Sequence, residues 1–287
     1  MSVKISPKLG EFSKTLVPLP EVVEFLNLKL VKVPEDRPYT WSISCSTLDN
    51  VISFHEPGAT GPEEIGLKHT NTVGNEADFR LLNGCWMFAD ASLITGQSLR
   101  MEEDCMCVPR IPEYLEYRIT VLGKPQLPYQ IILSYSGDLP KNHLIFQRED
   151  VQKIIFTSRL GIFRLSELTL LWKNILIIET PETSDDCLDL NWIFSHLRSH
   201  WNIEHLDVSA GGQVISQLIV SKLLDEIRVN FAGHIASLNN TIGIPRPRLF
   251  PIDYPMNMAN NPHVKYLGVR MIGDQYLFLR GSIEYRH

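Results

Sequence analysis

IEHLDVSAGGQVISQLIVSKLLDEIRVNFA, residues 203–232, decides how this chain is expected to fold. An apolar run of strand length, residues 203–208, is followed by a turn of small residues, 209–213. Apolar side chains then recur at helical spacing over residues 214–224 and alternate with polar ones over 227–231. A strand, a turn, a helix and a strand in this order are typical of a βαβ unit, so we expect two neighbouring parallel strands.

Two glycines, Gly211 and Gly212, stand where the first of these strands is expected to lead into the helix. Backbone N–H groups at a helix start favour a phosphate, and glycine lets the backbone approach a ligand closely. We therefore interpret the N–H groups of Gly211, Gly212 and Gln213 as a phosphate-binding turn. The alternative is a tight turn without a ligand, because a Gly-Gly pair is not the G-x-G-x-x-G fingerprint of dinucleotide-binding folds.

The composition limits the class of protein. Hydrophobic residues make up 44% of the 287 residues and charged ones 21%, which is ordinary for a globular protein. A net charge of -6 argues against a nucleic-acid surface. No apolar run is long enough for a membrane-spanning helix, and residues 1–14 lack the apolar core of a signal peptide. Five irregularly spaced cysteines favour reduced thiols in the cytoplasm, and Cys105 and Cys107 lack a second pair for zinc, so we expect no metal site.

The first half of the chain is expected to begin with an N-terminal arm, residues 1–38, that carries a helix over residues 20–30. The main domain then follows from residue 39. Its first expected elements are strands at 39–46, 51–54 and 85–89 and helices at 63–68 and 76–82. Residues 90–100 are expected to form a loop, and residues 101–127 form an insert without a clear pattern.

The second half shows stronger patterns. Strands are expected at residues 130–133, 153–156 and 174–179, and Asp189 is expected to cap a helix. A long irregular loop, 244–262, precedes two strands, 264–271 and 275–285, joined through Gly273 and Asp274. These elements predict one α/β domain over residues 39–287, with a mixed, mostly parallel sheet, helices on both faces and a C-terminal β-hairpin.

Five short motifs follow one another along this domain. They are Ser46-Thr47-Leu48-Asp49-Asn50, Ile131-Ile132-Leu133-Ser134, Ile155-Phe156-Thr157-Ser158, Val208-Ser209-Ala210-Gly211-Gly212 and Leu224-Asp225-Glu226-Ile227. Together they resemble the reductase domain of riboflavin biosynthesis, the RibD C-terminal family, which has a dihydrofolate reductase-like fold. Ser209-Ala210 stands where that family usually has a glutamate, and Asn50 replaces a glycine.

The resemblance implies an NADPH-dependent oxidoreductase, similar to 2,5-diamino-6-ribosylamino-pyrimidinone 5′-phosphate reductase and assembled as a homodimer. It implies Asp49 as the catalytic residue, with Thr47, Asp49 and Arg100 binding the substrate. The alternative for Asp49 is a turn-capping aspartate, and for Arg100 a solvated surface arginine. The cofactor-binding residues that it implies are Ser134, Thr157, Ser158, Arg159, Ser209, Gly211, Gly212 and Gln213.

Thr157, Ser158 and Arg159 further suit a 2′-phosphate, because they combine two hydroxyl groups with a guanidinium group. The alternative is an ordinary exit from a strand. Two other functions stay open. One is a reductase of the same fold that acts on another acceptor, such as a pterin, another imine or an enone. The other is a non-catalytic nucleotide-binding homologue.

Overall fold

The computed structural model describes residues 8–11, 17–28, 31–54, 72–166, 172–183, 187–274 and 276–286. The chain divides into two units. Unit 1 contains Met1–Leu30, Trp41–Cys85 and Gly212–His287, and unit 2 contains Val31–Thr40 and Trp86–Gly211. In the described residues no helix is long and apolar enough to cross a membrane.

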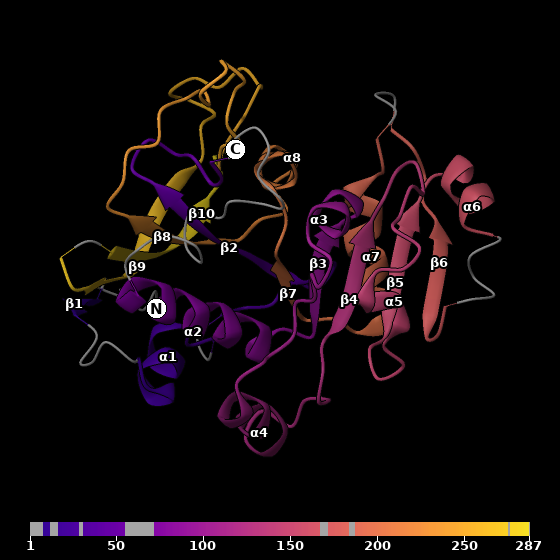
Figure 1. Cartoon of the computed structure of the whole chain (residues 1–287), viewed down its shortest axis with the longest axis horizontal. Helices are drawn as coiled ribbons and strands as arrows, with labels where there is room; N and C mark the ends of the chain where they lie inside the picture. The colour runs from indigo at the N-terminus through magenta and orange to yellow at the C-terminus, as the bar shows by residue number, and fades with distance from the viewer. Residues whose placement is uncertain are drawn as a thin grey trace. The chain divides into compact units, whose positions relative to one another are not determined.

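Unit 2 is built on parallel strands (Figure 1). Their order is β7 (His205–Val208), β3 (Ala91–Thr95), β4 (Tyr129–Leu133), β5 (Lys153–Thr157) and β6 (Ile175–Glu179). Consecutive residues of β3, β4 and β5 are buried, so both faces of these strands are covered. The helices of this unit are α3 (Gly96–Met101), α4 (Pro112–Thr120), α5 (Leu144–Gln147), α6 (Arg159–Leu165) and α7 (Leu190–Trp201).

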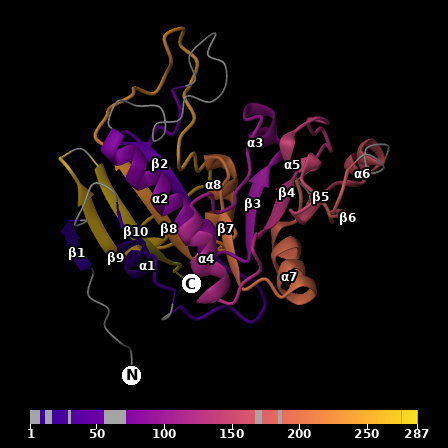
Figure 2. The ribbon, with the colours of Figure 1, turned by 60° about the horizontal axis from the view of Figure 1, so that its bottom comes forward.

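Unit 1 contains mixed strands. Their order is β1 (Lys8–Glu11), β9 (His263–Ile272), β10 (Tyr276–Glu284), β8 (Glu226–Ala232) and β2 (Tyr39–Thr47). β1 pairs with β9 and β2 with β8 in parallel, whereas β10 is antiparallel to both β9 and β8. The helices are α1 (Leu19–Phe25) and α8 (Gly212–Val220), and α2 (Thr72–Phe88) begins here and ends in unit 2. Figure 2 shows α2 across the strands of this unit.

The fold class is confirmed: an α/β protein with mostly parallel strands and a C-terminal β-hairpin. The strands expected at 130–133, 153–156 and 174–179 are confirmed as β4, β5 and β6. Asp189 caps α7 by accepting a hydrogen bond from the N–H of Trp192 at 3.0 Å. The hairpin turns through Gly273, whose φ of 56° lies in the left-handed region that glycine adopts freely.

Four sequence predictions are wrong. The strand expected at 85–89 is the end of α2, because a short apolar run alone does not distinguish a strand from a buried helix. The loop expected at 90–100 is β3 and α3; the strand is buried on both faces and so shows no alternation. In place of the strand expected at 51–54, the described residues form isolated bridging contacts, such as Val51 with Arg248.

The helix expected at 63–68 lies outside the described residues, so this prediction is not tested.

The fourth error concerns the βαβ unit, whose two strands are not neighbours. β7 pairs with β3, whereas β8 pairs with β2 and β10. The strand that pairs in parallel with β8 comes from residues 39–47, far back in the chain, and the local pattern of residues 203–232 contains no information about it.

Two polar side chains, Gln130 and Arg118, join the insert at 101–127 to the rest of unit 2. Gln130 on β4 accepts a hydrogen bond from the N–H of Cys107 at 2.9 Å and donates one to its carbonyl at 3.0 Å. Arg118 on α4 is fully buried and donates to the carbonyls of Trp86, Met87 and Ala89 at 3.2, 2.8 and 2.6 Å. The guanidinium group therefore satisfies carbonyls at the end of α2 that have no partner within the helix.

Candidate functional site

The carboxyl ends of the parallel strands in unit 2 bring several cofactor candidates together. β3, β4 and β5 are paired in register and end at Thr95, Leu133 and Thr157. Ligands of open parallel sheets bind beyond this edge, where loops and helix starts meet. Ser134 follows β4, and the segment 157–159 ends β5 and begins α6, so the pairing places these residues at one edge.

Two hydroxyl groups at this edge donate hydrogen bonds to backbone carbonyls of the protein itself. Thr157 Oγ1 donates to the carbonyl of Ser134 at 2.6 Å, and Ser158 Oγ donates to the carbonyl of Tyr135 at 2.7 Å. Ser158 also caps α6 by accepting from the N–H of Gly161 at 3.2 Å. Because Ser134, Thr157 and Ser158 are buried, they shape the loop after β4, and Arg159 is the exposed member of the expected 2′-phosphate site.

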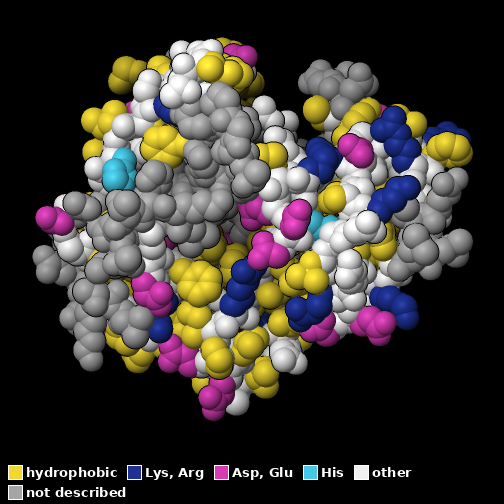
Figure 3. Space-filling model, in the orientation of Figure 1, with side chains coloured by type: hydrophobic (Ala, Val, Ile, Leu, Met, Phe, Trp, Pro, Cys, Tyr) yellow, Lys and Arg dark blue, Asp and Glu magenta, His cyan; other side chains and the backbone are white. Residues whose placement is uncertain are grey.

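Three arginines, which we call the basic rim, lie beside the loop after β4: Arg100, Arg159 and Arg164. Arg100 Nη1 donates to the carbonyl of Asp138 at 2.5 Å and lies 3.7 Å from its carboxylate. Arg164 Nη1 donates to the carbonyl of Ser136 at 3.1 Å. Figure 3 shows Lys and Arg side chains gathered around α3 and α6. Arg100, expected to bind substrate together with Thr47 and Asp49, thus lies in unit 2 beside the cofactor candidates.

The turn at 209–213 has two different glycines. Gly211 is exposed, and a Cβ added there would meet no atom within 4 Å. Gly212 is buried, and a Cβ there would clash with the backbone of residues 248 and 249. Gly212 is therefore required for close packing of the chain on itself, whereas Gly211 is open to a ligand.

The N–H groups of this turn support the phosphate interpretation. In the described residues no hydrogen bond is donated by the backbone N–H of Gly211, Gly212 or Gln213. They stand at the start of α8, where the helix dipole is positive. Ser209 does not contribute its hydroxyl proton, because Ser209 Oγ donates to the buried carboxylate of Asp207 at 2.7 Å and accepts from Trp86 Nε1 at 3.2 Å.

Asp49 joins two loops at the carboxyl end of β2 in unit 1. Its Oδ1 accepts from Thr47 Oγ1 at 2.6 Å and from the N–H of Ala236 at 3.0 Å, and its Oδ2 accepts from the N–H of Ser237 at 2.8 Å. Partial burial raises the pKa of Asp49, but the hydrogen bonds from Thr47 and from these backbone groups lower it below its usual value overall. The carboxylate is thus kept ionised.

Arg246 binds backbone in the same region. It donates from Nε to the carbonyl of Phe54 at 2.9 Å and from Nη1 to the carbonyl of Ala236, and its guanidinium group lies 5.1 Å from the Phe54 ring centroid. This buried arginine holds the irregular loop in place, whereas Arg248 is exposed.

Two buried carboxyl groups in unit 1, Asp78 and Glu226, were not identified as site candidates from the sequence. Asp78 on α2 accepts from Asn230 Nδ2 at 3.0 Å, and Glu226 on β8 binds Arg228 and Arg280. A signal for Asp78 was available, since it precedes the buried Leu81 and Cys85 by three and seven residues and so belongs to the buried stripe of its helix.

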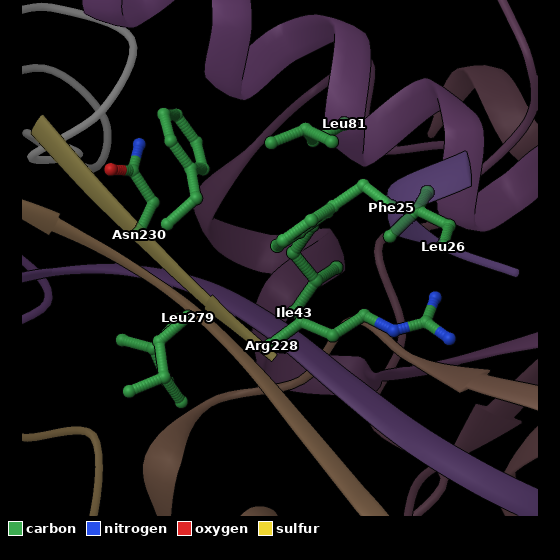
Figure 4. A pocket seen from close by; sticks show the side chains of 9 residues that line it. Phe25, Leu26, Ile43, Leu81, Arg228, Asn230 and Leu279 are labelled. Atoms are coloured by element: carbon green, nitrogen blue, oxygen red, sulfur yellow. The ribbon is translucent and has the colours of Figure 1, made fainter. Parts of the chain in front are cut away.

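Arg228 and Asn230, the partners of these carboxyl groups, line a cavity (Figure 4). Its wall is apolar except for Arg228 and Asn230 on β8, whose polar ends point to opposite ends of the cavity. The lining residues are Phe25, Leu26, Ile43, Leu81, Arg228, Val229, Asn230, Phe278 and Leu279. In the described residues no group of three or more His, Cys, Asp or Glu side chains is placed to hold a metal ion.

Comparison with known proteins identifies relatives of this fold. A family model for the RibD C-terminal domain matches residues 88–236, which are 149 of the 287 residues. No curated protein is significantly similar to the chain in sequence.

Solved structures also resemble this one. RibD of Acinetobacter baumannii has a TM-score of 0.62 at 17% identity, over 86% of this chain and 58% of that chain. A pyrimidine reductase-like protein of Corynebacterium diphtheriae has a TM-score of 0.62 at 16% identity, over 86% and 92%. A riboflavin biosynthesis reductase of Saccharomyces cerevisiae has a TM-score of 0.59 at 13% identity, over 92% and 99%. At these identities the likeness concerns the fold, and the chain spans little more than half of the A. baumannii protein.

Proposed function

Because the chain belongs to the RibD C-terminal domain family, we propose that it is an NADPH-dependent reductase that acts on 2,5-diamino-6-ribosylamino-pyrimidinone 5′-phosphate. The observation that carries this proposal is the turn at 209–213, whose N–H groups make no hydrogen bond to described residues and whose Gly211 is open to a ligand. The names of the similar reductases support the reaction class.

Each candidate residue has a role in this proposal. The N–H groups of Gly211, Gly212 and Gln213 would hold the pyrophosphate, and Arg159 the 2′-phosphate. When bound, the reduced nicotinamide supplies the hydride. Asp49 would orient the heterocycle through its ionised carboxylate, which Thr47, Ala236 and Ser237 hold in place by hydrogen bonds. An amino group of the substrate would be a further donor to this carboxylate.

The second candidate is a reductase of the same fold that acts on another acceptor, such as a pterin, another imine or an enone. The observation in its favour is the inward hydrogen bond of Ser209 to Asp207, at the position where the family usually has a glutamate. A nucleotide-binding protein without turnover is the third possibility.

The test is a titration with NADPH followed by absorbance at 340 nm with each acceptor. Oxidation of NADPH with the ribosylamino-pyrimidine phosphate would support the proposed substrate. Oxidation only with another acceptor would support the second candidate, and binding without any oxidation would support the third. Failure to bind NADPH would overturn the proposal as a whole.

The phosphate turn predicts an effect of Gly211→Val. A branched side chain at this position, where an added Cβ meets no atom within 4 Å, should keep phosphate oxygens away from the N–H groups. We expect NADPH affinity to fall at least tenfold, about 1.4 kcal/mol, with an unchanged urea unfolding curve. Gly212→Val is the contrasting variant, because its side chain clashes with backbone and should lower stability. Unchanged NADPH affinity in Gly211→Val would contradict the pyrophosphate site.

The basic rim predicts a preference between cofactors. NADPH should bind more tightly than NADH, because Arg159 can pair with the 2′-phosphate. Arg159→Ala should narrow this difference in affinity by about fivefold, since an exposed pair of opposite charges contributes on the order of 1 kcal/mol. Arg110→Ala is a matched control, an exposed arginine in the insert. The measurement is the ratio of the two dissociation constants, and an equal affinity of the unaltered protein for both cofactors would count against the site.

A further inference from the structure

Among the described residues of unit 1, two buried carboxyl groups, Glu226 and Asp78, have opposite kinds of partner. Glu226 receives hydrogen bonds from Arg228 Nε at 2.6 Å and from Arg280 Nε and Nη2 at 2.7 and 2.8 Å. Asp78 is 6% exposed, and in the described part of the chain its one hydrogen bond comes from the neutral amide of Asn230. Buried carboxylates are normally paired with a cation, so a purely structural account explains Glu226 and leaves Asp78 unexplained.

The strand register places Asp78 near the edge that carries Thr47 and Asp49. Thr47 on β2 pairs with Ala232 on β8, which pairs with Tyr276 on β10. The hydroxyl of Tyr276 donates to Asn75 Oδ1 at 3.1 Å. Asp78 lies one helical turn further along α2, beside the next row of the sheet, which contains Asn230.

Asn230 has unused hydrogen-bonding capacity beside Asp78. It is 2% exposed, its Nδ2 donates to Asp78, and its Oδ1 is buried without a hydrogen-bond partner among the described residues. It also lines the cavity of Figure 4. Buried polar atoms without a partner are rare and call for an explanation. A ligand with an N–H group would satisfy this oxygen and place a nitrogen next to Asp78.

We propose that Asp78, held by Asn230, donates the proton in the reduction of a C=N bond. This inference rests on the proposed function. The carbon accepts the hydride, the π electrons of the C=N bond move to the nitrogen, and the nitrogen takes the proton from the Asp78 carboxyl group. The carboxylate left behind regains a proton from water. Asn230 is the positioning residue, and Asp78 is catalytic because it touches the reacting nitrogen.

The local electrostatics are compatible with this role. Burial raises the pKa of Asp78 to about 6, and the Asn230 hydrogen bond opposes the rise. Among the described residues, the other titratable groups near this pair are Tyr276 on β10, whose pKa burial raises to about 12, Cys45 on β2 beside it, and Arg228, which lines the same cavity as Asn230. In the part of the chain that the structure describes, no charged side chain contributes to the shift in the pKa of Asp78. A general acid must be protonated to act, so the rate should fall as the pH rises through about 6.

The first test needs no cofactor. Carbon-13 NMR of aspartate-labelled protein, with the Asp78 signal assigned by its loss in Asp78→Asn, should show titration near pH 6. An Asp78 pKa at the ordinary value, about 4, would overturn the proposal.

The second test is single-turnover NADPH oxidation with the ribosylamino-pyrimidine phosphate across pH. Asp78→Asn should lower the rate about a hundredfold, leave NADPH affinity unchanged and abolish the fall above pH 6. The control Asp150→Asn changes an exposed aspartate paired with Arg148 and should keep the full rate. Asn230→Leu removes the hydrogen bond that lowers the pKa of Asp78. The rate of NADPH oxidation by this variant should therefore fall at a higher pH than in the unaltered protein. If Asp78→Asn does not fold, Asn230→Leu provides the test.

The outcomes separate this inference from the proposed function. Full activity of Asp78→Asn, or an unmoved pH profile in Asn230→Leu, would reject Asp78 as the donor and leave the reductase proposal intact. No NADPH oxidation by the unaltered protein with any acceptor would reject both.

Discussion

Glu226→Gln should lower the free energy of unfolding by about 3–5 kcal/mol, the usual effect of breaking a buried ion pair. Glu226 is fully buried, and Arg228 and Arg280 are 2% and 6% exposed. Glutamine preserves the shape of the side chain but leaves two buried guanidinium groups without a counter-charge. Arg228 also stacks 4.3 Å from the Trp41 ring centroid and donates to Cys85 Sγ at 3.0 Å, so it has little freedom to reach water.

Urea unfolding followed by circular dichroism measures this loss. Glu149→Gln is the matched control, because Glu149 pairs with Lys173 at the surface, where both side chains are more than 60% exposed. The control should change stability by less than about 1 kcal/mol. Equal effects of the two substitutions would show that the buried cluster stabilises the fold no more than a surface pair.

The same cluster predicts a pH dependence. Burial raises the pKa of Glu226, but the charges of Arg228 and Arg280 outweigh it and lower the pKa to about 2. A carboxyl group with a lowered folded-state pKa contributes stability above its unfolded pKa, about 4.3, and loses it as the pH falls toward the folded value. The difference between the unaltered protein and Glu226→Gln should therefore be constant above pH 5 and shrink below it.

Sequence patterns predicted the elements whose periodicity is local. α7 was found because its apolar stripe and its Asp189 cap lie within a dozen residues. β3 was missed because Ala91–Thr95 is short, buried on both faces and rich in small residues, which hides the period of a strand. The neighbours of β8 were missed because strand order depends on β2, which precedes it by almost two hundred residues.

The candidate site also contains one local motif, which the sequence shows, and contacts between distant residues, which it does not. The glycine turn at 209–213 is a local motif, so the sequence displays it, although only the structure distinguishes the open Gly211 from the packed Gly212. The pair of Asp78 and Asn230 joins residues 152 apart, and the bond of Arg228 to Cys85 joins residues 143 apart. No window of sequence contains such a pair, so their chemistry becomes visible only after the chain has folded.

Arg118→Met should also lower stability by about 3–5 kcal/mol, with its effect on unit 2. Methionine fills a similar volume without hydrogen-bond donors. Arg118 donates to the partly buried carbonyl of Pro125 at 2.6 Å as well as to the three buried carbonyls at the end of α2, so four acceptors would lose a charged donor. Each such loss costs on the order of 1 kcal/mol or more. Burial lowers the pKa of Arg118 to about 10, and it remains charged at neutral pH.

The loss of Arg118 should propagate from the insert to the edge of β3. Trp86, Met87 and Ala89 lead directly into Asp90, which accepts hydrogen bonds from the N–H groups of Glu204 and His205 at 3.0 and 2.9 Å. Release of the helix end should therefore increase amide hydrogen exchange at 204 and 205 as well as at the end of α2. Arg110→Met is the matched control, because this arginine belongs to the same insert, is exposed and should change stability by less than about 0.5 kcal/mol. Equal stability of the two variants, with unchanged exchange at 204 and 205, would mean that the insert is a surface addition that α2 does not need.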